Sequence, residues 1–571
     1  MDEHKKAVAS IAAQVRQFHA NRTPFRIYHG STNSTRPVSF QRDKLVDTSS
    51  LNRVLDVDKQ ARTVLVEPNV PMDALVAATL LHGLVPPVVM EFPGITVGGG
   101  FAGMGGESSS FRHGMFHEGV NWIEVVVGDG RVVVASSSSS PSPSDDDDDG
   151  GNGKDENADL FHGVAGTMGT LGITTLLELR LVEAKTFVEV SYWPVWSVHE
   201  AVEKVRLEAA RPAGEVDYVD GILFAADRGV VISGRLSDAI TAPDGRIQRF
   251  TRARDPWFYL HVEEMLTKSH PPTTAELGGA IEARSVGSDP TLPIVETVPL
   301  TDYLFRYDRG AFWTGYYAFK YFRVPFTAFI RWLGDGFMHT RVMYHALHRS
   351  GFAQKYIIQD LALPHGEAAE EFVEFVQQES GVGNGVGDCF PLWLCPLRLQ
   401  RREREASGSM HPRWRTSKYS SPSASSSRAV AATPRPDEML LNVGLWCPGP
   451  TNRDAFIKVN RAIEQKVSNL RGTKWLYAHT YYTEEEFWDI YDRQWYGRLR
   501  EKYGASYLPD VYEKVRVRDE QKEKQGAGVL ASIKGWVWGI WPLAGVYGVM
   551  STVIGGRGYL VEGERRGRKI A

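Results

Sequence analysis

The chain has 571 residues, and 65 Lys and Arg against 69 Asp and Glu leave a formal net charge of −4. With 42% hydrophobic and 23% charged residues, the composition excludes collagen, coiled coil and wholesale disorder. The near-neutral charge argues against a nucleic-acid binder. Three cysteines without a CxxC pair are too few for a disulfide scaffold or a structural zinc site. We therefore expect no metal site and a reducing compartment.

Two polar segments interrupt the folded sequence. Residues 136–157 are rich in Ser and Asp, and residues 401–437 are rich in Ser, Pro, Ala and Arg. Neither segment has enough apolar side chains to offset the entropy of ordering it. We interpret both as disordered surface insertions. Residues 1–20 are charged and helical in pattern, so we expect no signal peptide there.

The first ordered elements alternate between helix and strand. The hydrophobic pattern predicts a helix over Ala7–Phe18 and a strand leading into GSTNST at Gly30. Short strands follow at Leu45–Asp47 and Thr63–Glu67, and Met72–Leu81 reads as a helix that ends before Gly83. A run of hydroxyl side chains and backbone N–H groups after a strand is suited to an anion, although a solvated turn has the same composition.

A glycine-rich segment, Pro93–Gly114, is the most informative part of the sequence. It has seven glycines between Gly94 and Gly106, a density that lets the backbone approach a ligand closely. The segment is neither a Rossmann fingerprint nor a Walker A loop. A hairpin (Trp122–Val127 and Arg131–Ala135) and a second glycine loop within Asp159–Val182 follow.

The order of these pieces resembles the FAD-binding domain of the vanillyl-alcohol oxidase/PCMH flavoprotein family. The resemblance implies non-covalent FAD, because Ser31-Thr32-Asn33 stands where covalent members carry a histidine; His29 precedes the glycine and is interpreted as structural. The cofactor residues that it implies are Gly30, Ser31, Thr32, Asn33, Ser34, Thr96, Val97, Gly98, Gly99, Gly100, Gly103, Gly105, Gly106, Glu107, Ser108, Ser109, Gly169, Thr170, Gly172 and Ile173.

Later segments resemble the Δ24-sterol reductase branch of that family. The resemblance rests on TVGG…ESSS (Thr96–Ser110) and on five further segments, namely Pro299–Trp313, Tyr356–Pro364, Phe390–Leu399, Trp475–Ala505 and Leu508–Val515. It implies reduction of a side-chain double bond in a sterol or other lipid-like molecule, with NADPH as hydride donor. The alternative is an FAD-dependent oxidase or dehydrogenase of the same fold, and a scaffold without chemistry is a third reading.

We expect an α+β fold of two domains and a tail. Residues 1–185 would form a PCMH-type FAD-binding domain with two subdomains. Residues 186–525 would form an α/β substrate domain with an antiparallel sheet, and residues 526–571 a membrane-associating segment with a basic tail. The oligomeric state is not readable from the sequence.

Candidate proton donors come from Trp475–Tyr482, which reads as an alternating strand. Tyr477, His479 and Tyr481 would share one face of that strand, and each residue type can donate a proton. Residues 484–503 read as one helix with acids first and bases last.

Two segments indicate a membrane surface. Gly310–Leu333 interleaves aromatic and cationic residues, and Gly535–Gly556 carries no charge over 22 residues. A buried core helix broken at Pro325 and a buried C-terminal lobe are the respective alternatives. We expect attachment to the endoplasmic reticulum membrane, facing the cytoplasm, or a soluble cytoplasmic protein.

Overall fold

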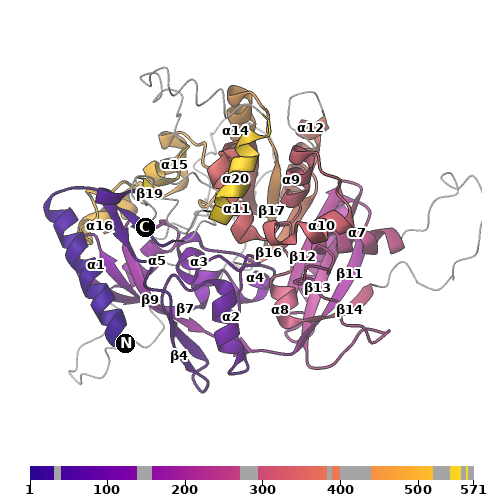
Figure 1. Cartoon of the computed structure of the whole chain (residues 1–571), viewed down its shortest axis with the longest axis horizontal. Coiled ribbons are helices and arrows are strands. Elements are labelled where there is room, and N and C mark those ends of the chain that lie inside the picture. Colours follow the sequence, from indigo (N-terminus) through magenta and orange to yellow (C-terminus); the bar gives the residue numbers. More distant parts are fainter. Residues whose placement is uncertain are drawn as a thin grey trace, which may run out of the picture.

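The protein is built around two antiparallel sheets. A computed structural model describes residues 1–30, 40–137, 157–269, 293–381, 389–398, 439–517, 541–554 and 561–562. Figure 1 shows the N-terminal elements at the lower left and the larger sheet at the right. The C-terminal helices α14 (Arg453–Asn469), α15 (Glu484–Ile490) and α20 (Leu543–Ile554) lie along the top, with α16 (Arg493–Lys502) at the left beside α1 (Asp2–Ala20) in this view. Helices and antiparallel sheets together confirm the predicted α+β class.

The smaller sheet belongs to the N-terminal part of the chain. Its strand order is β4-β5-β9-β7-β8, and all of its neighbours are antiparallel. A separate parallel pair, β1 (Arg26–Tyr28) and β3 (Leu45–Asp47), lies at the start of the chain. The sheet strands are β4 (Val54–Asp58), β5 (Thr63–Val66), β7 (Val120–Val127), β8 (Val132–Ser136) and β9 (Gly172–Arg180). The predicted hairpin at residues 122–135 is confirmed as β7 and β8.

Short helices and strand pairs complete this part. The helices are α1 (Asp2–Ala20), α2 (Met72–Leu80), α3 (Val97–Gly103), α4 (Ser110–His113) and α5 (Ala158–Val164). The two small strand pairs are β6 (Leu84–Val85) with β10 (Val182–Glu183), and β2 (Phe40–Gln41) with β19 (Val561–Glu562).

The larger sheet has eight strands in the order β14-β11-β13-β12-β16-β17-β15-β18, with every pair antiparallel. This arrangement agrees with the antiparallel sheet expected for the substrate domain. The strands are β11 (Phe187–Val195), β12 (Tyr218–Ala225), β13 (Arg228–Ser237), β14 (Ile294–Pro299), β15 (Tyr356–Pro364), β16 (Leu392–Arg398), β17 (Met439–Pro448) and β18 (Thr473–Lys474).

The two faces of the larger sheet are covered differently. One face packs against α6 (Val198–Ala209), α12 (Glu367–Gly381) and α14 (Arg453–Asn469), and forms its own hydrophobic core. The other face shares one continuous core with the smaller sheet. Around that shared core lie α7 (Phe258–Ser269), α8 (Leu300–Leu304), α9 (Thr314–Phe322), α10 (Ala328–Leu333) and α11 (Thr340–Ser350).

The C-terminal helices return to the N-terminal part. Tyr496 on α16 (Arg493–Lys502) donates a hydrogen bond to Thr170 at 2.7 Å, and Lys514 on α17 (Val511–Val515) donates one to the Met168 carbonyl. The last described helix, α20 (Leu543–Ile554), packs on α11. Sequence-distant segments therefore close the space between the two sheets.

Three local expectations are wrong. Residues 475–482 are turns after a two-residue β18, so the alternating strand is absent there. Residues 484–503 form two helices, α15 (Glu484–Ile490) and α16, because Tyr491 is extended and Asp492 caps α16 by accepting from the Trp495 N–H at 2.9 Å. Cys389 and Cys447 form a disulfide instead of remaining reduced, and Cys395 is free and buried.

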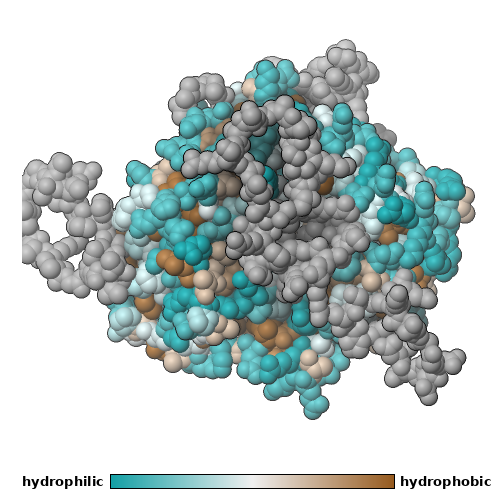
Figure 2. Space-filling model, turned by 180° about the vertical axis from the view of Figure 1, so that it is seen from behind, coloured by the Kyte–Doolittle hydropathy of each residue, from teal (hydrophilic) through white to brown (hydrophobic). Residues whose placement is uncertain are grey.

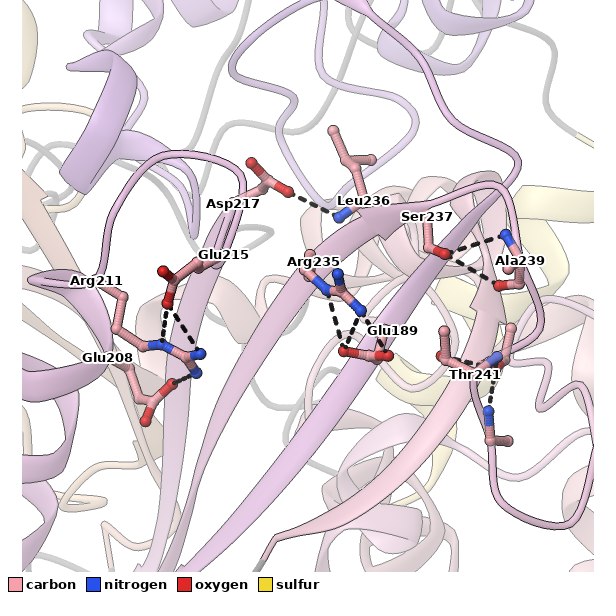
Figure 3. A network of polar contacts seen from close by, with 12 residues as sticks. Glu189, Glu208, Arg211, Glu215, Asp217, Arg235, Leu236, Ser237, Ala239 and Thr241 are labelled. Atoms are coloured by element: carbon pink, nitrogen blue, oxygen red, sulfur yellow. Dashed lines mark hydrogen bonds and ion pairs between the residues drawn. The ribbon is translucent and has the colours of Figure 1, made fainter.

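A cluster of ion pairs lies on strands β11 and β13, on the end of α6 and on the segment that follows α6. Figure 3 shows Arg235 on β13 facing its register partner Glu189 on β11, at 3.0 Å, and Arg211 between Glu208 and Glu215. Most of these side chains are partly exposed, and such pairs contribute at most about 1 kcal/mol each. We therefore assign this cluster to folding and not to chemistry.

A buried histidine attaches α1 to the smaller sheet. The His4 ring lies between two carboxylates, 2.9 Å from Glu67 and 3.2 Å from Glu124. Hydrogen bonds to both acids raise the pKa of His4 to about 9, whereas burial opposes the shift. Burial raises the pKa of Glu67, but bonds from His4 and Arg53 outweigh it and hold that pKa at about 2.

We predict that His4→Gln destabilises the protein by about 3 kcal/mol, because the buried Glu67 and the partly buried Glu124 lose their cation. The raised pKa of His4 gives stability that is full below pH 6.5 and is lost as the pH rises toward 9. The lowered pKa of Glu67 gives stability that is full above pH 4.5 and is lost as the pH falls toward 2. Urea unfolding should therefore show the largest difference from the native chain between pH 4.5 and 6.5. The exposed His82→Gln is the control, and an equal loss there would contradict the assignment.

Candidate functional site

A cavity of about 390 Å³ lies where the two sheets meet. The glycine-rich helix α3 and the loop after it form one wall, and the start of β9 forms another. The opposite wall comes from the larger sheet and from the segment before α9. The cavity therefore lies between the two parts of the chain to which the sequence assigned cofactor and substrate.

Strand periodicity places the wall of the larger sheet. Along β15, Ile357 and Leu361 point to the core of the helix-covered face, whereas Ile358 and Asp360 line the cavity. Trp393 on β16 and Trp446 on β17 also line the cavity, and Trp446 is the register partner of Ile358. Three adjacent strands thus present one acid and two indoles to the same space.

Most of the predicted cofactor residues line the cavity. They are Thr96, Gly98, Gly99, Gly100, Gly103, Gly105, Gly106, Glu107, Gly169, Gly172 and Ile173. Thr96 caps α3 by accepting from the Gly99 N–H at 3.1 Å. A Cβ at Gly172 would lie 2.7 Å from the Val126 carbonyl oxygen, and Gly169 has a φ of +73°. These two glycines are therefore required by the backbone itself, while Gly103 has only the Tyr477 ring nearby, at 3.6 Å.

Other predicted cofactor residues have structural contacts away from the cavity lining. Val97 is fully buried, and Gly30 adopts a φ of +74°. Ser109 donates to the Pro87 carbonyl at 2.8 Å, and Thr170 accepts from Tyr496. The carbonyl of Ser108 accepts from the Val219 N–H at 2.7 Å. Ser31, Thr32, Asn33 and Ser34 lie outside the described residues.

The three candidate proton donors are separated by the turns that replace the expected strand. Tyr477 lines the cavity, next to Gly103. Tyr481 belongs to the core behind the sheet, where its ring lies 6.3 Å from that of Phe456. His479 is buried, and its carbonyl accepts hydrogen bonds from Gln359 and Lys474. The structure therefore brings only Tyr477 of the three to the cavity.

Tyr477 lies beside Asp360, a residue that sequence reasoning missed, and each of the two groups shifts the pKa of the other. Burial raises the pKa of the Asp360 carboxyl to about 6, although hydrogen bonds from Asn442 and Tyr477 oppose the shift. Burial and the nearby Asp360 raise the pKa of Tyr477 well above its usual range. The pair therefore keeps the phenol protonated beside a carboxyl that titrates near neutral pH.

A second acidic pair, Glu91 and Glu107, lies in the same cavity wall. The two carboxyls hydrogen-bond to each other, and both are about 5% exposed. Burial raises the pKa of Glu107 well above its usual range, and the charge of Glu91 raises it further. Glu91 Oε1 and Glu107 Oε2 have no hydrogen-bond partner among the described residues. A polar group entering the cavity would satisfy these buried oxygens.

A buried cation supports this wall from behind. Arg306 donates to Asp220 at 2.8 Å, and Asp220 also accepts from Tyr307 at 2.8 Å and from Trp393 at 3.1 Å. The Tyr307 ring stacks on Phe312, which in turn stacks on Trp446 with centroids 4.4 Å apart. Phe312 has a φ of +59°, a strained conformation for a bulky residue. The aromatic wall is thus fixed through one carboxylate.

The opposite end of the cavity is basic. Arg26, His29 and Lys514 line it near the second glycine loop, and Lys514 also holds the Met168 carbonyl. Burial lowers the pKa of His29 to about 4, so its ring is neutral, and the positive charge comes from Arg26 and Lys514. These two cations suit a pyrophosphate, and the orphan carboxyl oxygens and aromatic rings suit a polar, flat ring system. The residues present therefore fit FAD, the cofactor that the sequence resemblance implies.

Comparison with known proteins confirms the class. Residues 6–136 match the family model described as "FAD binding domain", so the chain carries the FAD-binding domain that the sequence predicted. Over its length the chain is similar to Δ24-sterol reductases. It is 25% identical to the human protein over 90% of this chain and 86% of that protein.

More distant organisms have similar proteins. The Caenorhabditis elegans homologue of Δ24-sterol reductase is 24% identical over 90% of this chain and 87% of its own. The Arabidopsis thaliana Δ24-sterol reductase is 24% identical over 84% and 78% respectively. The resemblance drawn from separate motifs thus extends across nearly the whole chain.

Several cavity residues carried signals that the sequence reasoning did not use. Asp360 is a lone acid inside the apolar strand Tyr356–Pro364, and Glu91 is a lone acid between apolar residues. A single charge in an otherwise buried run indicates a functional or paired group. Lys514 had no such signal, because it lies about 340 residues from the loop that it contacts.

We predict that Lys514→Met lowers FAD affinity by about tenfold, which corresponds to about 1.4 kcal/mol, because a phosphate would lose one cation. The ratio of flavin absorbance to polypeptide after dialysis measures this. The exposed Lys59→Met should retain the native ratio. Full flavin retention in Lys514→Met would exclude this lysine from the cofactor site.

Proposed function

We propose that the protein is an FAD-dependent oxidoreductase that reduces a carbon–carbon double bond in a sterol-like lipid, the C24 bond of its relatives' names. The observation that carries this proposal is the Tyr477–Asp360 pair, placed beside the glycine helix α3 in a cavity with an aromatic far wall. Similarity to Δ24-sterol reductases over 90% of the chain supports it.

The residues divide the work. FAD, when bound and reduced, supplies hydride. Tyr477 Oη donates a proton to the less substituted alkene carbon, and the Asp360 carboxyl returns a proton to the phenolate. Trp446, Phe312 and Trp393 hold the apolar substrate against the cofactor and exclude water from the reacting carbon. Burial and the neighbouring Glu91 raise the pKa of Glu107, so its carboxyl would offer a hydrogen-bond donor to the polar edge of the cofactor.

NADPH as the hydride donor and non-covalent attachment of FAD are parts of this proposal. Anaerobic mixing of the purified protein with NADPH should bleach the flavin absorption near 450 nm, a general property of flavins. Acid precipitation should release the flavin into the supernatant. Flavin that stays with the precipitate would overturn non-covalent binding, and unbleached flavin would overturn the NADPH-dependent reductase.

A dehydrogenase on the same fold is the second candidate. The observation that favours it is Asp360 itself, because a carboxyl with a pKa near 6 is mostly ionised at neutral pH and can act as a base. Such an enzyme would consume oxygen or another acceptor with an alcohol substrate and ignore NADPH. The anaerobic experiment therefore separates the two candidates.

We further propose that the protein attaches to a membrane surface, at the endoplasmic reticulum and facing the cytoplasm. Among the described residues no helix is long and apolar enough to cross a bilayer. The uncharged segment Gly535–Gly556 is described only from Trp541 to Ile554, where it forms α20 on the surface of α11. Segment 310–333 forms α9 and α10, and α10 has no buried residue.

We predict that Tyr477→Phe lowers turnover by about 10²- to 10³-fold while FAD stays bound, because only the proton-bearing oxygen is removed. Tyr481→Phe removes the same atom from a ring outside the cavity and should leave turnover unchanged. Single-turnover assays with a Δ24-sterol, after flavin content is matched, measure both. Equal activity in the two variants would remove Tyr477 from the mechanism.

We predict that turnover falls as the pH rises through about 6, because Asp360 must carry a proton to resupply Tyr477. Asp360→Asn keeps a neutral group in place, so it should be slow but lose this limb of the pH profile. Stopped-flow rates from pH 5 to 8 measure the limb. A limb that persists in Asp360→Asn would assign it to another group.

A further inference from the structure

A second, apolar chamber of about 150 Å³ adjoins the cofactor cavity. The two spaces share four wall residues, Phe92, Tyr344, Ile358 and Trp446. The rest of the chamber comes mainly from α9, α11 and α20, and its lining is almost entirely hydrocarbon and aromatic. A space of this composition next to the reacting position fits a hydrocarbon ligand.

The helix α20 forms one side of this chamber. Gly545, Val549 and Thr552 line it, one helical turn after another. Close packing holds the helix in place, since a Cβ at Gly548 would lie 2.8 Å from the Ala346 carbonyl oxygen on α11. Tyr547 accepts a hydrogen bond from Arg349 at 2.9 Å on the same side. The buried face of α20 is therefore a fitted wall.

The opposite face of α20 is apolar as well, yet exposed. Leu543, Val546 and Met550 are 44%, 43% and 51% exposed, and α20 contains no charged residue. The segment from α10 to Phe337 also exposes apolar side chains, with Phe329 at 64%, Leu333 at 68% and Phe337 at 40%. We call Leu543, Val546, Met550 and the exposed Trp541 the apolar patch. Phe337 is exposed and also lines the chamber, so it marks an opening of the chamber.

The border of the patch has the character of a lipid interface. Arg323 lies over the Trp541 ring at 4.7 Å, and Trp541 donates to the Tyr321 carbonyl at 2.7 Å. Tryptophan and arginine at the edge of an apolar surface are typical of helices that lie in the headgroup region. In Figure 2, on the reverse side of the molecule, hydrophilic residues predominate among the described ones and hydrophobic residues appear as separate spots.

We propose that α20 closes a hydrocarbon-binding chamber and that the apolar patch docks on a membrane surface, so that a lipid substrate passes from the bilayer past Phe337 into the chamber. This inference rests on the proposed function, whose substrate is lipid-like. At 12 residues, α20 is about 18 Å long, too short for a hydrocarbon core of about 30 Å. Over its described residues the helix therefore fits a position on the membrane surface, with its other face packed on α11.

The docking surface is tested by flotation of the full chain with phosphatidylcholine vesicles that contain a minor fraction of phosphatidylserine. The triple variant Leu543→Glu, Val546→Glu, Met550→Glu should lower the floated fraction by at least about tenfold, because three apolar side chains would leave the interface. The control triple Leu81→Glu, Leu207→Glu, Ile240→Glu changes exposed apolar residues elsewhere and should float like the native chain.

The chamber is tested with the fluorescent sterol dehydroergosterol in the same preparations. Val549→Trp fills the chamber and should lower probe affinity by about tenfold or more, whereas Val546→Trp, on the exposed face, should bind normally. Flavin content confirms that each variant is folded, and Thr552→Phe fills the same wall if Val549→Trp does not retain flavin.

Three results would overturn the proposal. They are native flotation of the glutamate triple variant, native probe binding by the chamber variants, and a native dimer that the triple variant dissociates without any vesicle binding. The last result would make the patch a protein interface. Neither assay requires turnover. If NADPH failed to reduce the flavin, the proposed function would be overturned, but flotation and probe binding would still test the docking surface and the chamber.

Discussion

The cavity depends on the charge of one buried carboxylate, Asp220. It is fully buried and accepts hydrogen bonds from Arg306, Tyr307 and Trp393, which come from two segments far apart in the chain. Breaking such a pair leaves an uncompensated buried guanidinium, which costs about 3–5 kcal/mol. Because Tyr307 stacks on Phe312 and Phe312 on Trp446, the carboxylate also sets the position of the aromatic wall.

This arrangement explains how strain is kept at the site. Phe312 holds a positive φ that a bulky side chain rarely adopts, and it is fixed between two rings that are themselves hydrogen-bonded or buried. The same close packing requires glycine at position 444 on β17, since a Cβ there would lie 2.4 Å from the Trp446 ring and 3.0 Å from Asp360. The wall therefore leaves little freedom to the acid that faces the cofactor.

The sequence predicted those features that depend on local residue patterns and on the order of motifs. The glycine segment, the hairpin at residues 122–135 and the antiparallel character of the second sheet all follow from short-range signals. Tyr477 lines the cavity, although its segment is a series of turns and not the expected strand. Asp360 was missed although a lone acid in an apolar strand is a readable signal, whereas Lys514 was missed because its contact joins distant segments, which spacing along the chain does not encode.

The two ends of the cavity differ in a way that orders the chemistry. Cations gather at the second glycine loop, buried acids with raised pKa values lie in the middle, and hydrocarbon begins at Trp446 and continues under α20. In the proposed reaction, a charged cofactor and an apolar substrate would therefore approach from opposite sides and meet beside Tyr477. Water would be excluded from that point, because the cofactor would cover one side and the aromatic rings cover the other. A proton held there by a phenol and a carboxyl would pass to an alkene carbon more readily than exchange with solvent.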